Sequence, residues 1–104
     1  MKGLGDLMKK AQEMKANMDR LQEELATREV EAGAGGGMVT VVATGAQEIA
    51  SVKIDPSVID PDEKEMLQDL IQAAVNEALR KSKEMMQEEM NKITGGLPVP
   101  DIFG

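Results

Sequence analysis

The sequence contains no cysteine and no histidine, and Phe103 is its only aromatic residue. Disulfide bonds, thiolate nucleophiles, imidazole bases and the usual zinc ligands are therefore excluded. Because most common catalytic and metal-binding arrangements depend on these groups, we expect neither an enzyme nor a bound cofactor. The near absence of aromatic rings also argues against a protein that stacks the bases of single-stranded nucleic acid.

Long apolar runs are missing as well. No segment approaches the roughly 18 consecutive apolar residues that a membrane-spanning helix needs, and the N-terminal residues do not have the pattern of a secretory signal. We therefore expect no membrane association and a location in the cytoplasm. The 104 residues, 41% of them hydrophobic, suffice for a modest core, and we expect a single domain over residues 1–104.

Apolar residues recur at spacings of three and four in the N-terminal part of the chain. This pattern predicts a helix over residues 1–26 with a heptad seam. The seam consists of Leu4, Leu7, Ala11, Met14, Met18, Leu21 and Leu25. From Leu4 to Leu25 the helix would be about 33 Å long, which is too long for one small sheet to cover.

β-Branched residues interrupted by glycine fill the middle of the chain and predict a three-stranded antiparallel sheet within residues 28–54. We expect strands at residues 28–32, 38–44 and 48–54. Neither face of the second strand is strongly polar, so we expect helices on one side and a partner on the other. The edges of so short a sheet could also be extended by a second protomer.

The glycine-rich segment Gly33–Gly37 has two interpretations. A phosphate-binding loop requires Gly-Lys-Ser or Gly-Lys-Thr leading into a helix, whereas here a strand follows. The pattern therefore favours a turn between strands.

The residues Asp60-Pro61-Asp62-Glu63 predict the start of a second long helix, over residues 61–94, with Asp60 as the N-cap. Its first half has a broad apolar face for packing against the sheet and the first helix. Beyond Arg80 the apolar stripe narrows, which indicates that the helix leaves the core and runs beside another helix. Gly95-Gly96 ends it, and we expect the tail, residues 95–104, to be mobile or lightly docked.

Two short motifs are more specific than the helices around them. They are Thr44-Gly45-Ala46-Gln47-Glu48 and Ile54-Asp55-Pro56, and a glycine-rich lead and a closing Thr94-Gly95-Gly96-Leu97-Pro98 accompany them. With these motifs the sequence resembles the YbaB/EbfC nucleoid-associated DNA-binding family over nearly its whole length. The resemblance implies an α+β fold with a long N-terminal helix, a three-stranded antiparallel sheet and a long C-terminal helix. It also implies a tweezer-like homodimer in the bacterial nucleoid that grips duplex DNA between protruding helices with low sequence specificity.

The net charge of −7, from 12 basic and 19 acidic residues, disagrees with this resemblance, since a simple electrostatic DNA binder is usually basic. Phosphate contacts depend, however, on where the cations lie. If the two long helices pair antiparallel, we expect their far ends to meet away from the sheet and to bring Lys2, Lys9 and Lys10 near Lys83 and Lys92.

The candidate DNA-binding residues are basic residues of the two helices: Lys2, Lys9, Lys10, Lys15, Arg80, Lys81, Lys83 and Lys92. Lysines that reach phosphates rather than base edges predict weak sequence preference. Each of them could instead belong to an ordinary solvated helix face.

The nine methionines support an alternative function, because Met-rich surfaces bind protein partners adaptably. The chain would then be an acidic helical clamp or adaptor for a protein partner. Helix packing is the more common role of such residues; we expect Met14 and Met18 to face the second helix and some of Met85, Met86 and Met90 to be exposed. Both hypotheses predict a homodimer, since a lone three-stranded sheet with two long helices would leave apolar surface in water.

Overall fold

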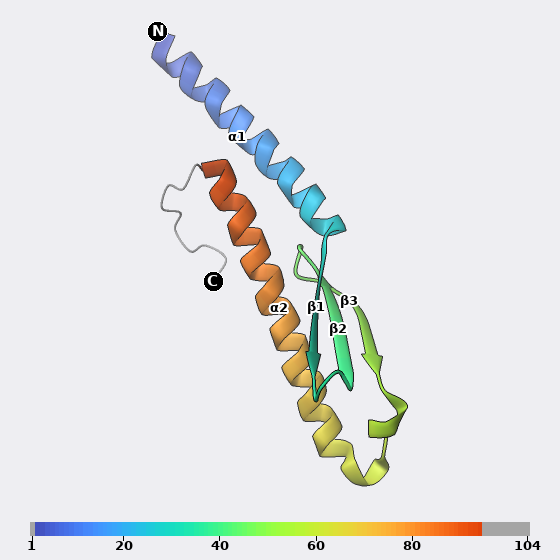
Figure 1. Ribbon diagram of the computed structural model, residues 1–104. Helices are drawn as coiled ribbons and strands as arrows, with labels where there is room; N and C mark the ends of the chain where they lie inside the picture. Colours follow the sequence, from blue (N-terminus) through green and yellow to red (C-terminus); the bar gives the residue numbers. More distant parts are fainter. Residues whose placement is uncertain (1, 95–104) are drawn as a thin grey trace.

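The computed structural model describes residues 2–94, and it has the expected fold class (Figure 1). The predicted tail, residues 95–104, lies outside the described residues. Helix α1 is followed by three strands, two 3-10 turns and helix α2. Their bounds are α1 Lys2–Thr27, β1 Glu29–Ala34, β2 Val39–Thr44, β3 Ile49–Ile54, η1 Pro56–Val58, η2 Pro61–Glu63 and α2 Lys64–Thr94.

Two boundaries differ from the predicted ones by more than one residue. Strand β1 extends to Ala34, and the turn after it, residues 35–38, contains Gly35, Gly36 and Gly37, all with positive φ. Helix α2 begins at Lys64 rather than at residue 61, because the chain first forms the 3-10 turn η2. The Asp60 side chain accepts a hydrogen bond from the Asp62 backbone N–H, so the predicted N-cap caps this turn instead.

The three strands form an antiparallel sheet in the order β1-β2-β3, and α2 packs across one face of it. On β2 this face carries Val39, Val41 and Ala43, which are completely buried. Ala74 and Ala78 of α2 are also completely buried, and their small side chains let the helix backbone lie close to the strands. The prediction that a helix covers one side of the sheet is thus confirmed.

The two helices run in opposite directions beyond the sheet, as Figure 1 shows. Leu21 and Leu25 of α1 pack with Met90 of α2 in a second, smaller cluster. The far ends of the helices do not meet, which corrects the prediction: α1 continues well past the end of α2. The molecule is therefore elongated, with extents of 72 × 22 × 17 Å.

Neither helix within residues 2–94 combines the length and apolar character needed to cross a membrane.

Candidate nucleic-acid interface

The turn between β2 and β3 joins the long helices to the sheet. The backbone N–H of Gly45 lies 2.9 Å from the carbonyl oxygens of both Leu25 and Arg28, where α1 leads into β1. The hydroxyl of Thr44 accepts a hydrogen bond from the backbone N–H of Ala46 at 3.2 Å. The most specific motif of the sequence therefore fixes the point at which α1 leaves the sheet.

Close packing requires glycine at position 45. We call this place, where the β2–β3 turn contacts the end of α1, the joint. A Cβ atom on Gly45 would lie 2.6 Å from the carbonyl oxygen of Leu25 and 2.9 Å from the Cε of Met85. From α2, the buried hydroxyl of Ser82 donates a hydrogen bond of 2.5 Å to the carbonyl oxygen of Thr44. Both helices are thus attached to the same turn, a role that the sequence pattern did not predict.

A charged network connects α2 to Arg28, the residue between α1 and β1. Glu89 accepts hydrogen bonds of 2.9 Å from both Lys92 and Arg28. The bond from Lys92, with a smaller effect from Arg28, lowers the pKa of the Glu89 carboxyl. Lys92 also lines a hollow that includes Asn17 and Arg20 of α1, so it lies away from the tip of α1 where Lys9 and Lys10 were expected to meet it.

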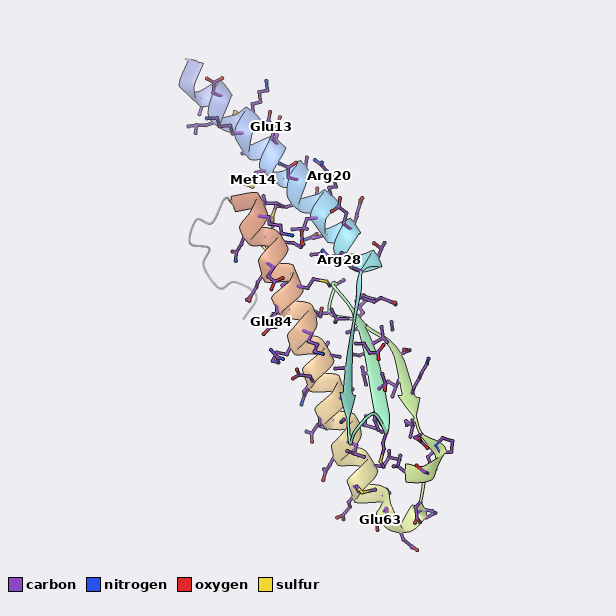
Figure 2. All side chains as sticks on the ribbon, in the orientation of Figure 1. Glu13, Met14, Arg20, Arg28, Glu63 and Glu84 are labelled. Carbon is purple, nitrogen blue, oxygen red and sulfur yellow. The ribbon has the colours of Figure 1, made fainter. Side chains whose placement is uncertain are left out.

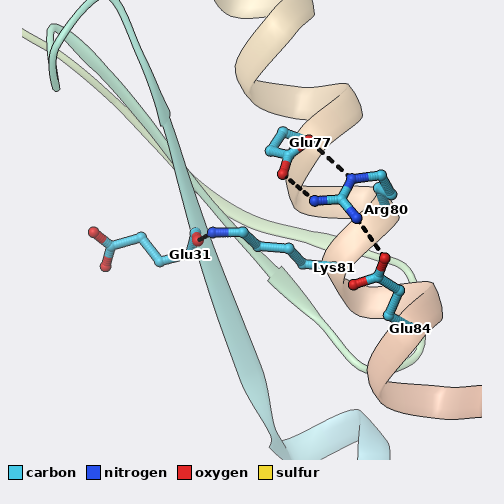
Figure 3. A network of polar contacts seen from close by, with 5 residues as sticks. All are labelled: Glu31, Glu77, Arg80, Lys81 and Glu84. Atoms are coloured by element: carbon cyan, nitrogen blue, oxygen red, sulfur yellow. Dashed lines mark hydrogen bonds and ion pairs between the residues drawn. The ribbon is translucent and has the colours of Figure 1, made fainter. Parts of the chain in front are cut away.

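Two further candidate residues of α2 are engaged within the protein (Figure 3). The guanidinium of Arg80 bridges the carboxylates of Glu77 and Glu84, and this raises the pKa of Arg80 and lowers that of Glu77. The ammonium of Lys81 donates a hydrogen bond of 2.9 Å to the backbone carbonyl of Glu31 on strand β1. Phosphate binding by either side chain would compete with these contacts.

The lysines of α1 are in a different environment. Lys9, Lys10 and Lys15 are exposed, and the ion pairs seen among residues 3–93 involve only Arg28, Arg80 and Lys92 as cations. The candidate side chain of Lys2 lies outside the described residues, and Lys83 is half-buried on α2. The structure therefore separates the candidates: Arg80, Lys81 and Lys92 are bound to neighbouring groups, whereas no ion pair seen among residues 3–93 involves Lys9, Lys10 or Lys15.

Sequence reasoning omitted one basic residue of the same helix. Arg20 is exposed on α1, and its guanidinium contacts the Asn17 side-chain oxygen at 2.7 Å. Because Arg20 lies on the predicted first helix, its position could have placed it among the candidate DNA-binding residues.

The acidic residues are unevenly distributed along the molecule. Residues 55–79 lie at the end of the molecule opposite the part of α1 that extends beyond α2. They contain seven carboxylates and one lysine, a net charge of −6. Residues 2–16, which form the free half of α1, contain four lysines and two carboxylates, a net charge of +2. The whole-chain charge of −7 is thus mainly a property of the end farthest from this arm.

Within the described part of the chain, no group of three or more Asp or Glu side chains is arranged to hold a metal ion.

Fold and site together define a small α+β protein with a protruding, lysine-bearing helix. The sequence profile of the YbaB/EbfC DNA-binding family matches residues 1–97, and this chain belongs to that family. The predicted family is thereby confirmed.

Curated relatives and a solved structure support this assignment. The chain is 58% identical to a "Nucleoid-associated protein" of Acetivibrio thermocellus, covering 96% of this chain and 89% of the relative. It is 56% identical to a "Nucleoid-associated protein" of Moorella thermoacetica, covering 94% and 97% of the two chains. A crystal structure of an uncharacterized protein from Helicobacter pylori matches with a TM-score of 0.69 and 25% identity, over 80% of this chain and 96% of that one. The family and the names of the relatives indicate a DNA-binding protein rather than an enzyme.

Proposed function

We propose that this protein binds duplex DNA in the nucleoid as a homodimer, with low sequence preference, and that the free half of α1 supplies the phosphate contacts. The main supporting observation is the contrast between Lys9, Lys10 and Lys15, which are exposed, and the basic residues of α2, several of which are bound to neighbouring groups. Positive charge at the tip of an extended arm would meet phosphates first, while the acidic end points away.

Low specificity follows from the kind of side chain on the arm. Lysine is a flexible point charge that suits phosphate oxygens, whereas base edges are usually read by residues that form paired hydrogen bonds. The arm cations in the first half of α1 are all lysines. They would position the protein on DNA of any sequence.

Dimerisation is supported by the two unequal edges of the sheet. Val41 of β2 pairs directly with Val52 of β3, so both side chains lie on the face that α2 covers. Helix α2 buries Val41 completely but leaves Val52 44% exposed, and Ile49 on the same strand is 40% exposed. At the other edge, Lys81 already binds the carbonyl of Glu31 on β1. We therefore assign the dimer contact to the β3 side, where apolar surface and an open strand edge coincide.

A dimer formed there would carry two α1 arms, one from each protomer. Two arms with basic tips would grip a duplex from both sides, and this doubles the number of phosphate contacts available to one bound molecule.

The methionines of α2 give little support to a protein clamp. Met90 is 7% exposed, and Met85 and Met86 pack against the cluster that joins α1 to α2. Met18 of α1 belongs to the same cluster, as predicted, whereas Met14, near the end of α2, is 46% exposed. Met85, Met86 and Met90 thus serve in helix packing, whereas Met66 near the start of α2 is 42% exposed.

DNA binding is tested by fluorescence anisotropy of a labelled random-sequence duplex at several salt concentrations. We expect salt-sensitive binding, with a log–log slope of about −0.9 for each phosphate neutralised, and poor competition by single strands. Lys9→Glu with Lys10→Glu should weaken binding about tenfold or more at low salt and make the slope less steep by about 1 for each lost contact.

The matched control is Lys64→Glu with Gln68→Glu and Gln72→Glu, which changes the net charge equally but at exposed positions of α2. Equal losses in the two variants would show that only total charge matters and would remove α1 from the site. Absence of duplex binding by the unaltered protein at low salt would refute the function itself.

The dimer is tested separately by sedimentation equilibrium. Val52→Asp should convert a dimer into a monomer, because a carboxylate would be buried at the proposed contact. Ala73→Asp, at an exposed position of α2, should leave the dimer unchanged. A monomer in the unaltered protein would rule out the two-armed arrangement.

A further inference from the structure

The heptad seam of α1 changes its environment halfway along the helix. In the half nearer the sheet, Leu21 and Leu25 are buried against α2. In the other half Leu4, Leu7 and Met14 are 59%, 65% and 46% exposed, although they continue the same seam. Figures 1 and 2 show why: α1 extends beyond α2, and Met14 is near the level at which α2 ends.

The chain leaves α2 where this exposed seam begins. Ile93, in the last turn of α2, lines a hollow with Asn17 and Leu21 of α1. Ten residues, 95–104, follow Thr94. They therefore start beside the exposed seam, and no long connection is needed to reach it.

The composition of these ten residues suits an apolar groove. Leu97, Val99, Ile102 and Phe103 are apolar, and Asp101 is the only charged side chain. Proline at positions 98 and 100 favours an extended chain that has no internal hydrogen bonds and loses little conformational freedom on docking.

The lengths of the two segments also agree. Leu97 and Ile102 are five residues apart, or about 15 Å in an extended chain of this kind. Leu4 and Met14 are ten residues apart, or about 15 Å along a helix. By helical periodicity Lys10 and Lys15 flank the seam on its two sides, where either would complement the charge of Asp101.

We propose that the chain's own C-terminal segment, residues 97–103, docks in extended form along the free half of the α1 seam, with Leu97 near Met14 and Ile102 near Leu4. The segment would cover apolar surface that α2 is too short to reach. Lys9 projects from the opposite side of α1 by helical periodicity and would stay exposed. This proposal does not depend on DNA binding.

Disulfide trapping is a clean test, because the natural chain has no cysteine. In Ala11→Cys with Val99→Cys, a pair that lies side by side in this arrangement, mild oxidation should form a disulfide within one chain. The matched control is Lys9→Cys with Val99→Cys, which moves the first cysteine to the opposite side of α1. A docked tail holds one pair close and the other apart, so we expect about tenfold faster closure in the first variant.

Equal rates in the two variants would mean that the segment is not docked on the seam and would overturn the proposal. A covalent dimer as the main product of the Ala11 variant would assign the seam to a second copy and would overturn it too. As an independent measurement, removing residues 95–104 should increase amide hydrogen exchange severalfold in residues 4–14 of α1 but not in α2 beside the sheet. Unchanged exchange in residues 4–14 would also contradict docking.

Discussion

The half of the molecule around the sheet and the half formed by the helical arms are built differently. In the sheet half, α2 lies across β1 and β2. Ala74 and Ala78 of α2 and Val41 of β2 are completely buried at this contact. In the arm half, the two helices meet through a small cluster, and α1 then continues alone. The sheet half also carries the acidic end. The difference indicates that the sheet half provides most of the stability, while the arm half offers surface and charge to a partner.

The largest effect is expected from a carboxylate placed inside the sheet half. Ala74→Asp would bury an unpaired charge between α2 and the sheet, and we expect it to abolish the cooperative folding transition measured by circular dichroism on heating. Ala73→Asp, one residue away and exposed, should unfold within about 0.5 kcal/mol of the unaltered protein. Similar melting of the two variants would contradict the assignment of the core to this half.

A smaller loss is expected at the joint between the halves. Gly45→Ala would force a Cβ atom against the Leu25 carbonyl, and overpacking of this kind costs about 1–3 kcal/mol. Urea unfolding should show this loss, and amide exchange should rise first in the last turn of α1. Gly33→Ala is the control, because its Cβ atom would approach nothing closer than 3.5 Å. Equal stability of the two variants would mean that the turn does not hold α1 tightly.

The acidic end, residues 55–79, should affect DNA binding by the arms only through long-range repulsion of the DNA. Asp62→Asn with Glu63→Gln removes two of the seven carboxylates within residues 55–79. Duplex affinity should increase about twofold at low salt and return to the unaltered value at high salt, where such repulsion is screened. An increase that persists at high salt would point instead to a direct DNA contact at this end.

The smallest effect concerns the charged network of Arg28, Glu89 and Lys92. The pKa of Glu89 is lowered from 4.5 in the folded protein, so the network stabilises the fold above this pH and loses its contribution as the pH falls through the lowered value. Glu89→Gln should therefore lower the thermal midpoint slightly at pH 7, and the difference should shrink as the pH falls through the lowered pKa of Glu89. A difference of the same size throughout the acidic titration would assign the effect to packing rather than charge.

The fold was predictable because local signals in the chain agree with one another. Spacing of three and four specified both helices, and β-branched residues separated by glycine specified the strands. The face of β2 that carries Val39, Val41 and Ala43 followed from alternation alone and is buried as expected.

The candidate site was predictable only as a set of basic residues on helices. Which of them are engaged depends on neighbours far apart in the sequence: Lys81 binds the carbonyl of Glu31, and Glu89 joins Arg28 to Lys92. Contacts at such separations leave no local pattern, so the grouping of Lys92 with Lys9 and Lys10 was wrong.

The sequence by itself determined the elements, the family and the presence of charge on the helices, because each of these depends on residue type and short-range spacing. Only the tertiary structure decided where α1 passes beyond α2 and which lysines stay exposed. It also decided why position 45 must be glycine, since the close contacts there join α1, the sheet and α2 at one point. Helix overhang, side-chain partners and steric room are properties of packed elements, and a linear pattern does not contain them.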